Sequence, residues 1–489
     1  MLVLALDVGT SSARARAFDA AGRAQPGAEG QVGYEPRATP DGGVELDAER
    51  LLAAAVESID ACLAGLGGGA GRIAAVGVSV FWHSLLALDA AGRPLTPVIT
   101  WADTRSAGAA EALRRAHDER RIHARTGAPL HPAFFLAKLR WLREARRDAF
   151  ARAATWCGFG EYLHARFTGR LATSLSMASG TGLLDQVGGG WDPDMLTVAG
   201  LIPGQLPPID DAAAPALVAP YQARWPSLAR VPWHPARGDG ACSNVGSDCW
   251  DAGRVALNVG TSAALRVVLP EPPGPYAATP WGLWRYRVDG RRALVGGATS
   301  EGGNVLAWCR KHLALPPDPV GLEAALETVE PDGHGLTGLP FFAGERSPGW
   351  RPGARAAVAG LSLGTGAVEI TRALLESVAF RLAEVYDLLR PLAANGHRVV
   401  ASGGALAHSP VWAQILTDAL GIPVAVSTYA EASARGAALL ALEALGMPAP
   451  EAPPPGRTLE PNPRRHARYR AARERQRRLY DNIVGFMHS

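Results

Sequence analysis

Two short segments, far apart in the chain, place the same small and hydroxyl-bearing residues directly after an apolar run. Leu4–Ser11 reads LALDVGTS and Val255–Ser262 reads VALNVGTS. A turn of this composition directs several backbone N–H groups and hydroxyls at one point, and its lack of bulky side chains lets an anion approach the backbone. We therefore expect two phosphate-binding loops facing each other across a cleft, although each segment alone could be an ordinary hairpin turn. The loop residues are Gly9, Thr10, Ser11, Ser12, Gly260, Thr261 and Ser262.

The residue that ends the apolar run differs between the two segments, being Asp7 in the first and Asn258 in the second. Two carboxylates facing a triphosphate would repel it. A single carboxylate can instead help to hold a magnesium ion, directly or through water, because hard oxygen ligands suit that cation. We therefore predict that Asp7 lies beside a bound Mg2+. The alternative is an aspartate that only ends a strand.

A third glycine-rich turn, SGGA at residues 402–405, lies between an expected strand and an expected helix. Without side chains, the backbone of such a turn can support a flat purine or its ribose. Gly302 and Gly303, directly before a helix expected from Asn304, would form the opposite lip of this site. The nucleotide contacts predicted from these turns are Gly303, Gly403, Gly404 and Ala405.

Asp239 is the strongest candidate for a catalytic base. Transfer of a phosphoryl group to a hydroxyl needs a base near the attacking oxygen, together with positioning and charge neutralisation. Asp239 stands between two glycines in ARGDGACSNVG, where the two halves of the chain meet. We expect it on the floor of the cleft, near the metal with Asp7 and, with Gly240, in contact with the acceptor. The alternative is a Gly-Asp-Gly turn without a catalytic role.

Aromatic and planar polar side chains occur together in two segments that suit a polyol. VSVFWHSLLALD contains Trp82 and His83, and ITWADTRS contains Trp101, Asp103 and Arg105. Aromatic faces stack on the C–H faces of a sugar, and planar polar groups form paired hydrogen bonds with its hydroxyls. We predict that Trp82, His83, Asp103 and Arg105 bind the acceptor. An ordinary partly buried patch is the alternative, since the chain contains 13 tryptophans.

Hydrophobic periodicity indicates the elements that would position these residues in the first half of the chain. Residues 2–6 and 13–18 are an expected β-hairpin, followed by a helix over residues 47–63. A strand over residues 73–80 leads into the aromatic segment, and residues 108–170 are mainly helical in this interpretation.

The strand-turn-strand pattern restarts at Val255, which predicts a second, homologous half. A long amphipathic helix is expected over residues 366–390, and a basic helix over residues 464–486. The expected fold class is α/β, with mixed sheets and helices in each of two lobes. We place the N-terminal lobe, with the sugar site and the first phosphate loop, at residues 1–240. The C-terminal lobe, with the nucleotide site and the closing helix, follows at residues 241–489.

Bulk composition limits the class of protein. The chain of 489 residues is 47% hydrophobic and 19% charged, which is typical of a globular protein and excludes a disordered one. A net charge of +3 gives no reason to expect a nucleic-acid partner. The two lysines, Lys138 and Lys311, both lie outside any Gly-x-x-x-x-Gly-Lys segment, which excludes a Walker-type phosphate loop.

The sequence is typical of a soluble cytoplasmic protein. The N-terminal MLVLALD is interrupted by Asp7 and has no basic lead, so we interpret it as a strand and not as a signal peptide. No stretch approaches the length of apolar sequence that a membrane span requires. The five cysteines lack metal-type CxxC spacing, and we expect them to be reduced thiols.

Together these motifs resemble the FGGY family of carbohydrate kinases. DVGTSS is similar to the first phosphate loop of that family, GDGA to its catalytic-base segment, NVGTS to its second phosphate loop and SGGA to its adenosine loop. AAVAGLSLGTGAVEITRALLE is similar to its C-terminal signature. The resemblance, which runs from about residue 2 to 445, implies the two-lobed actin-like, or ribonuclease H-like, ATPase fold. It also implies ATP with Mg2+ as donor, Asp239 as general base and closure of the lobes over a sugar.

Within the family, ITWADTRS, RTGAPLHPAFFLAKLRWL and GGATSEGGNVLAW are most similar to gluconate kinases. This resemblance implies phosphorylation of D-gluconate to 6-phosphogluconate, with xylulose or a related ketose or polyol as the alternative acceptor. Trp82 replaces the methionine of the Met-His substrate pair, and Phe81 and Phe135 also depart from the usual pattern. An anionic sugar acid needs a cation in its pocket, which Arg105 or Lys138 could supply.

Two other classes of protein fit part of the sequence. An actin-like nucleotide-switch protein without a sugar substrate should lack Asp239 and the aromatic patch. A nucleic-acid or acidic-lipid binder has only the basic C-terminal helix in its favour, and a solvated closing helix is the better explanation of that feature. We therefore expect a small-molecule sugar or sugar acid as the partner, no nucleic acid and no membrane, with a homodimer as the candidate assembly.

Overall fold

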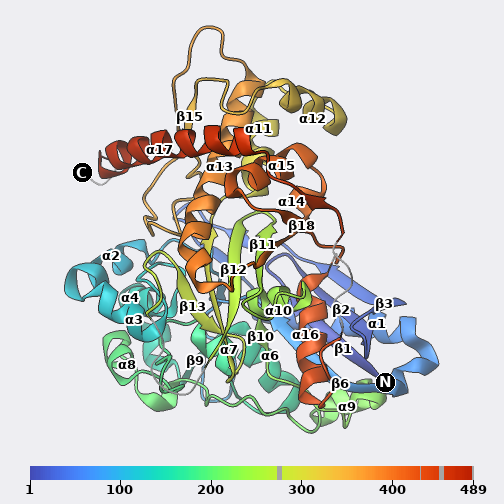
Figure 1. Cartoon of the computed structure of the whole chain (residues 1–489). Coiled ribbons are helices and arrows are strands. Elements are labelled where there is room, and N and C mark those ends of the chain that lie inside the picture. The colour runs from blue at the N-terminus through green and yellow to red at the C-terminus, as the bar shows by residue number, and fades with distance from the viewer. Residues whose placement is uncertain (272–277, 430, 451–455, 487–489) are drawn as a thin grey trace.

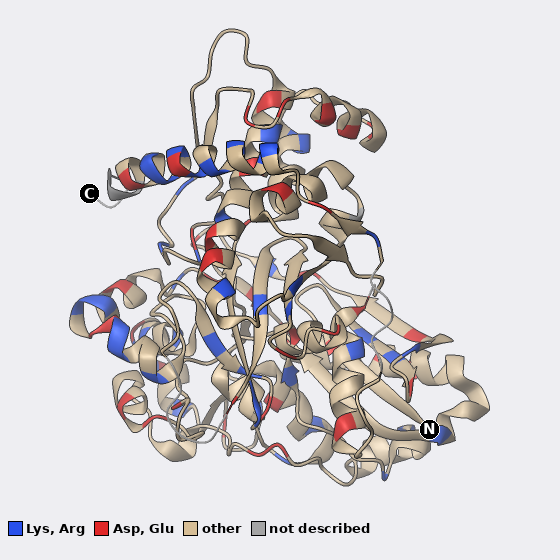
Figure 2. Cartoon of the chain, viewed as in Figure 1, with Lys and Arg blue, Asp and Glu red and all other residues tan. Residues whose placement is uncertain are grey.

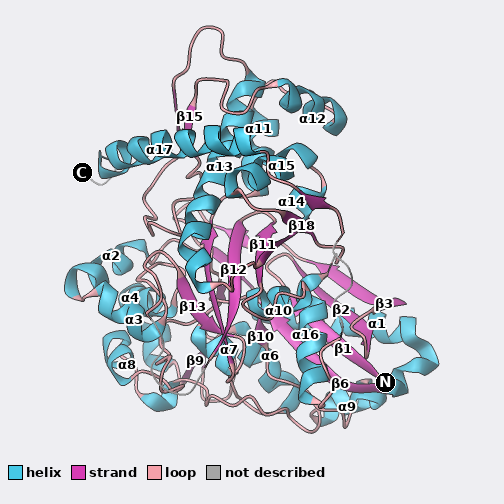
Figure 3. Cartoon of the chain, in the orientation of Figure 1, coloured by secondary structure: helices cyan, strands magenta, loops and turns pink. Residues whose placement is uncertain are grey.

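The computed structural model describes residues 1–271, 278–429, 431–450 and 456–486. The chain forms two lobes, each built on a mixed β-sheet with helices packed against it (Figures 1 and 3). The predicted α/β fold class is therefore confirmed. The two lobes meet beside helices α10 and α16, near the middle of the molecule.

The sheet of the first lobe has the strand order β10-β6-β1-β2-β3. Strand β1 is buried along its whole length, because it lies between β2 and β6 inside the sheet. A strand with both faces covered needs apolar residues at successive positions, which explains the run LVLAL at the start of the chain. The strands are β1 (Leu2–Val8), β2 (Ser12–Asp19), β3 (Ala24–Gly33), β6 (Ile73–Val80) and β10 (Arg237–Gly238).

The sheet of the second lobe has the order β13-β14-β12-β11-β17-β18-β19. Strand β11 lies between β12 and β17 as β1 lies between β2 and β6. The strands are β11 (Arg254–Val259), β12 (Ala263–Pro270), β13 (Trp284–Arg287), β14 (Arg292–Thr299), β17 (Arg398–Ser402), β18 (Val424–Val426) and β19 (Thr458–Leu459).

The five central strands of the two sheets have the same order and the same directions. In each sheet an antiparallel hairpin pairs with a third antiparallel strand on one side and with two successive parallel strands on the other. The repeated sequence therefore occupies equivalent hairpins. Their turns differ in length, because Val8 faces Ala13 in the first hairpin and Val259 faces Ala263 in the second, which leaves one residue fewer in the second turn.

Long helices cover these sheets. Helix α1 (Ala48–Leu66) packs on β2 and β3, and its N-terminus is capped by Asp47, whose side chain accepts a hydrogen bond from the backbone N–H of Arg50 at 2.8 Å. Helix α13 (Ala367–Leu389) packs on β12 and β14 and is buried along much of its length.

The remaining elements complete the two lobes. Helices α2, α4 and α8 pack with neighbouring loops around a separate apolar cluster of the first lobe. The shorter strands are β4 (Arg37–Ala38), β5 (Val44–Leu46), β7 (Leu86–Leu88), β8 (Val98–Ile99), β9 (Thr155–Cys157), β15 (Thr337–Leu339) and β16 (Ala357–Ala359). The other helices are α2 (Ala107–Ala116), α3 (Glu119–Thr126), α4 (Phe135–Ala145), α5 (Arg147–Arg152), α6 (Phe159–Thr168), α7 (Leu175–Ser179), α8 (Pro193–Ala199), α9 (Ala219–Arg224), α10 (Asp239–Gly246), α11 (Gly303–His312), α12 (Pro319–Thr328), α14 (Gly404–Ala407), α15 (Pro410–Leu420), α16 (Ala432–Ala444) and α17 (Pro463–Phe486).

One helical segment, residues 48–72, has the length and apolar composition of a membrane span, contrary to the expectation that no stretch approaches one. Leu51, Leu52 and Ile59 of this segment are buried in the main apolar cluster of the first lobe. The apolar face of α1 is therefore accounted for by its packing on the sheet.

The basic C-terminal helix α17 packs along the second lobe, and its charged positions are mostly arginine, interrupted by the acidic Glu474 and Asp481 (Figures 1 and 2). Tyr469 and Gln476 are buried. Arg473 pairs with Asp387 at 2.5 Å, and Arg475 pairs with Asp332. The prediction of a closing helix is confirmed, and part of its positive charge is neutralised within the chain.

Helices α10 and α16 cross at two glycines. Added to Gly246, a Cβ atom would overlap the carbonyl oxygen of Ala432, and on Gly436 it would overlap that of Cys242. The absence of side chains therefore lets the two helix backbones touch. Helix α16 follows a strand of the second sheet, yet it packs on β1 and β6 of the first.

We predict that Gly436→Ala lowers the free energy of unfolding by about 1–3 kcal/mol, because the added methyl group forces the α10 and α16 backbones apart. Urea denaturation of the purified protein measures this change. Gly108→Ala is the matched control: Gly108 is an exposed residue of α2 with no neighbour near its Cβ position. That substitution should leave stability unchanged or raise it by about 0.5–1 kcal/mol. Equal stability of the Gly436→Ala variant and the wild type would contradict the prediction.

Candidate active site

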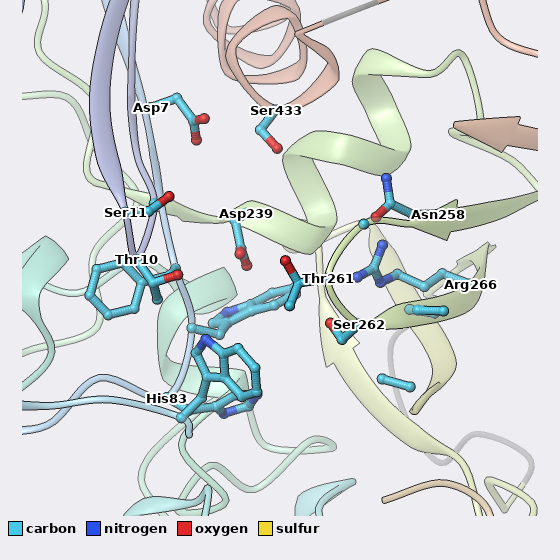
Figure 4. A pocket seen from close by; sticks show the side chains of 18 of the residues that line it. Asp7, Thr10, Ser11, His83, Asp239, Asn258, Thr261, Ser262, Arg266 and Ser433 are labelled. Atoms are coloured by element: carbon cyan, nitrogen blue, oxygen red, sulfur yellow. The ribbon is translucent and has the colours of Figure 1, made fainter. Parts of the chain in front are cut away.

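The two predicted phosphate loops lie on opposite sides of one cavity of about 350 Å³ (Figure 4). The cavity opens between the β1–β2 turn of the first lobe and the β11–β12 turn of the second, with Asp239 between them. Among the residues discussed from the sequence, those that line the cavity are Asp7, Gly9, Thr10, Ser11, Ser12, Phe81, Trp82, His83, Trp101, Asp239, Asn258, Gly260, Thr261 and Ser262.

Each loop is closed by a backbone hydrogen bond, from the N–H of Gly9 to the carbonyl of Ser12 and from the N–H of Gly260 to the carbonyl of Ser262, both at 2.9 Å. The second loop is buttressed by the segment before α11, where the N–H of Gly303 donates to the carbonyl of Gly260 at 2.7 Å. A Cβ on Gly302 would lie 2.7 Å from the carbonyl oxygen of Ser262. The close approach of these backbones therefore requires glycine.

The third glycine turn adjoins the second loop from the other side. Gly403 has a φ of 105°, and a Cβ there would overlap the carbonyl of Val259 at the end of β11. On Gly303, a Cβ would lie 3.4 Å from the Cβ of Ala405. The structure thus brings the predicted nucleotide residues Gly303 and Ala405 together, and Gly403 adjoins the end of β11. None of these three residues, nor Gly404, lines the cavity.

Asp7 and Asn258 occupy equivalent positions with opposite hydrogen-bond roles. Asp7 is paired with Ser79 across the parallel strands, and its Oδ1 accepts a hydrogen bond from the Ser79 hydroxyl at 2.7 Å. Asn258 is paired with Ser402, and its Nδ2 donates to the Ser402 hydroxyl at 3.1 Å. Burial, with a smaller contribution from the charge of Asp239, raises the pKa of Asp7 to about 6.

Asp239 is the first residue of α10 and follows β10 directly. Its Oδ1 accepts a hydrogen bond from the N–H of Gly240 at 2.8 Å. Burial raises the pKa of Asp239 above its ordinary value, and the positive charge of Arg266 partly opposes the shift. A carboxylate with a raised pKa is a stronger proton acceptor, which suits a general base.

Trp82 fills a hollow that three glycines leave open. A Cβ on Gly180 would lie 2.6 Å from the indole, one on Gly240 would lie 2.7 Å from it, and one on Gly238 would overlap it. The indole Nε1–H donates to the carbonyl of Ser176 at 3.1 Å. The tryptophan that departs from the family pattern is thus held in a matching recess, with part of its ring facing the cavity.

His83 lies in the left-handed region of backbone space, with a φ of 63°. Its Nδ1 is 2.7 Å from the carbonyl oxygen of Gly180, which can only accept, so Nδ1 carries the proton. Burial, and then the charge of Arg346, lowers the pKa of His83 well below its ordinary value. The ring is therefore neutral, and its Nε2, 3.4 Å from the Tyr286 hydroxyl, is a hydrogen-bond acceptor at the cavity wall.

Asp103 and Arg105, predicted to bind the acceptor, are absent from the cavity wall. Arg105 is buried between Asp103 and Glu45, with an Nη2–carboxylate distance of 2.6 Å to each, and its guanidinium lies over the ring of Trp141. The guanidinium of Arg105 and the carboxylate of Asp103 are therefore engaged within the protein and do not contact the cavity. Gly240, also predicted to contact the acceptor, packs against the Trp82 ring and does not line the cavity.

Lys138, the other cation considered for a sugar acid, is fully buried. Its Nζ donates to the carbonyls of His83 at 2.5 Å and Thr100 at 2.8 Å, with that of Ile99 at 3.4 Å. These carbonyls use its donors, and the side chain is absent from the cavity wall. Neither cation expected from the sequence therefore reaches the cavity.

The cavity has other cationic and aromatic walls that sequence reasoning missed. Arg266 extends from β12, and a Cβ on Gly240 would lie 3.2 Å from its Nε. An arginine inside the apolar strand AALRVVL was a usable signal for it. Arg346, in an irregular segment, carries no comparable signal. The missed wall residues are Arg14, Arg266, Trp284, Tyr286, Arg346 and Ser433.

Residues 2–246 match the N-terminal domain of the FGGY family of carbohydrate kinases, and residues 255–445 match its C-terminal domain. A gluconokinase of Bacillus subtilis is 30% identical over 463 residues, covering 91% of this chain and 88% of that protein. A glycerol kinase of Alkalilimnicola ehrlichii is 33% identical over 463 residues, covering 91% and 90%.

Solved structures of carbohydrate kinases are also similar to this chain. A gluconate kinase from Lactobacillus acidophilus superposes with a TM-score of 0.88 at 26% identity, covering 99% of this chain and 98% of that one. A xylulose kinase from the same organism superposes with a TM-score of 0.87 at 26% identity and the same coverage. The duplicated sheets, the paired loops and both domain matches lead to one conclusion: the chain belongs to the FGGY family of carbohydrate kinases.

Proposed function

We propose that this carbohydrate kinase transfers the γ-phosphoryl group of ATP to the terminal hydroxyl of D-gluconate, giving 6-phosphogluconate and ADP. The observation that carries the proposal is the position of Asp239, which lies between two facing glycine-rich loops in a cavity whose other wall is aromatic. The similarity to a gluconokinase and to a gluconate kinase supports the choice of acceptor.

The proposed reaction divides the cavity into two ends. The backbone N–H groups and hydroxyls of residues 9–12 and 260–262 would bind the phosphates, with the adenosine over residues 403–405. The acceptor oxygen attacks the γ-phosphorus, the bond from that phosphorus to the oxygen bridging to the β-phosphorus breaks, and ADP leaves. Asp239 takes the proton of the attacking hydroxyl. Arg266, which lies beside Asp239 and the second loop, would offset negative charge on the transferred group.

Magnesium is the metal that this family resemblance implies, and the residues present suit it. Asp7 and Asp239 both line the cavity, and in the described part of the chain no group of three or more His, Cys, Asp or Glu side chains forms a complete metal site. Mg2+ usually binds one or two carboxylates together with substrate phosphates and water, so a two-carboxylate wall is sufficient. When bound, the ion would neutralise phosphate charge, with Asp7 and Asp239 holding it directly or through water.

A neutral ketose or polyol is the second candidate acceptor, because relatives include a glycerol kinase and a xylulose kinase. The FGGY match of both halves argues against the nucleotide-switch alternative, which has no sugar substrate. We also propose a cytoplasmic location. The buried free thiols Cys62, Cys157, Cys242, Cys249 and Cys309 support it, since free thiols are typical of a reducing compartment.

Asp239→Asn should leave ATP affinity nearly unchanged and lower kcat by about 10²- to 10⁴-fold, because the amide cannot accept the proton of the attacking hydroxyl. An ADP-release assay measures turnover, and calorimetry measures ATP binding. The matched control is Asp148→Asn, at an exposed position of α5, which should keep the turnover of the wild type. Normal turnover by Asp239→Asn would remove Asp239 from the role of base.

Asp7→Asn should fold normally, because Asn258 already makes the equivalent contact with a serine in the second lobe. The loss of one carboxylate should weaken the Mg2+-dependent part of ATP binding by about 10- to 100-fold. Titration of ATP with and without Mg2+ separates this effect from a general loss of affinity. An unchanged response to Mg2+ would exclude Asp7 from the metal site.

A panel of sugars, polyols and sugar acids in the ADP-release assay tests the choice of acceptor. We expect D-gluconate to give the highest kcat/KM, and phosphate to appear on its terminal hydroxyl when the product is examined by NMR. Turnover of a ketose or polyol without turnover of gluconate would replace the proposed acceptor by the second candidate.

A further inference from the structure

Arg346 is the cationic residue at the aromatic end of the cavity. It lies in the loop between β15 and β16 of the second lobe, with its guanidinium 5.8 Å from the ring centre of Trp101 in the first lobe. The charge of Arg346 is also the main electrostatic influence on the pKa values of His83 and His131, both of which it lowers. Arg346 therefore lies near the histidine and tryptophan side of the cavity.

The backbone on both sides of Arg346 is anchored to the core of the second lobe. Glu345 pairs with Arg381 of α13, and the N–H of Ser347 donates to the carbonyl of Ala298 in β14 at 2.9 Å. The Ser347 hydroxyl accepts a hydrogen bond from the N–H of Ala298 at 3.1 Å. Arg346 is thus presented to the cavity from a fixed position.

The guanidinium of Arg346 is not paired with a carboxylate in the described part of the chain, and its Nε is buried without a hydrogen-bond partner. Two buried arginines of this lobe are paired: Arg372 with Glu376 at 2.8 Å, and Arg381 with Glu345 and Glu384. Arg266, the other arginine of the second lobe that lines the cavity, resembles Arg346 in having a buried Nε without a partner. A half-buried charge without a partner in the protein is costly, which indicates that a ligand supplies the missing anion.

The acidic groups near Arg346 are already accounted for. Burial raises the pKa of Glu301 to about 8, so this side chain is largely neutral at physiological pH. Asp239 is the proposed base and faces Arg266 at the phosphate end. The third group whose charge would act on Arg346, Tyr286, is an uncharged phenol whose pKa is raised by burial.

We propose that Arg346 binds the carboxylate of an acidic acceptor, so that the cavity is specific for aldonic acids over neutral polyols. This inference rests on the proposed function and assigns its substrate class to a residue. A carboxylate and a guanidinium form two parallel hydrogen bonds, which fixes one end of the sugar chain. The carbon chain would then lie along Trp82, Trp101 and Tyr286, with the opposite terminal hydroxyl directed at Asp239.

The test compares two acceptors of the same chain length, D-gluconate and its neutral analogue D-glucitol, with wild type, Arg346→Gln and Arg346→Lys. Arg346→Gln should raise the KM for gluconate on the order of 10- to 100-fold, as expected for the loss of hydrogen bonds between charged groups. Its kcat/KM for glucitol and its KM for ATP should stay within about twofold of wild type. Arg346→Lys should restore part of the gluconate affinity. Arg351→Gln, at an exposed position of the same loop, is the matched control.

The melting temperature of the free protein provides a second readout. If Arg346 had only a structural role, its substitution would lower this Tm. Removal of an uncompensated buried charge should leave the Tm of the free protein unchanged or raise it. Gluconate without ATP should raise the Tm of the wild type and leave that of Arg346→Gln unchanged. A lower Tm of the free variant, or an equal loss of kcat/KM with both acceptors, would overturn the inference.

The outcomes separate the two proposals. If the wild type phosphorylates gluconate and Arg346→Gln does so with an unchanged KM, the assignment of Arg346 fails and the proposed function stands. If the wild type phosphorylates only neutral acceptors, the gluconate proposal fails and the carboxylate assignment fails with it.

Discussion

The contact between the backbones of α10 and α16 is the constraint on which the site depends. Because Gly246 and Gly436 carry no side chains, the two helices cross at backbone distance, and each begins at the cavity. Asp239 opens α10, and Ser433 lies in the first turn of α16. The same crossing joins the lobes, since α16 follows the second sheet and packs on the first. The packing of α10 against α16 therefore helps to fix the position of the proposed base.

The two sheets beside this crossing have the same topology, but they present different side chains to the cavity. The hairpins and parallel strands of the two sheets correspond, yet Asp7 of the first lobe is replaced by Asn258 in the second. The serine partner is retained in both lobes, with the direction of its hydrogen bond reversed. One sheet therefore offers carboxylate oxygens while its counterpart offers neutral donors, an arrangement that suits a polyanion bound between them together with a cation.

Sequence patterns predicted the parts of the site that depend on local order. The repeated hairpin, its glycine turns and Asp239 all follow from residues close together in the chain, and the structure brings them to one cavity. The cations could not be assigned this way, because the state of a charged side chain depends on partners far along the chain. Arg105 is neutralised by Glu45, and Lys138 is held by the carbonyl of His83. Arg346 could be assigned to the cavity only from the structure, in which no carboxylate of the described residues pairs with it.

The recess around Trp82 restricts which substitutions the acceptor end of the cavity can accept. Any side chain at position 238 would overlap the indole, and side chains at 180 and 240 would be crowded against it. A smaller residue at position 82 would leave a void, and a buried void lowers stability in proportion to its volume. A side chain can therefore be introduced at these glycines only after the tryptophan has been replaced by a smaller residue, so that substitutions at the four positions are tolerated in one order and not in the reverse.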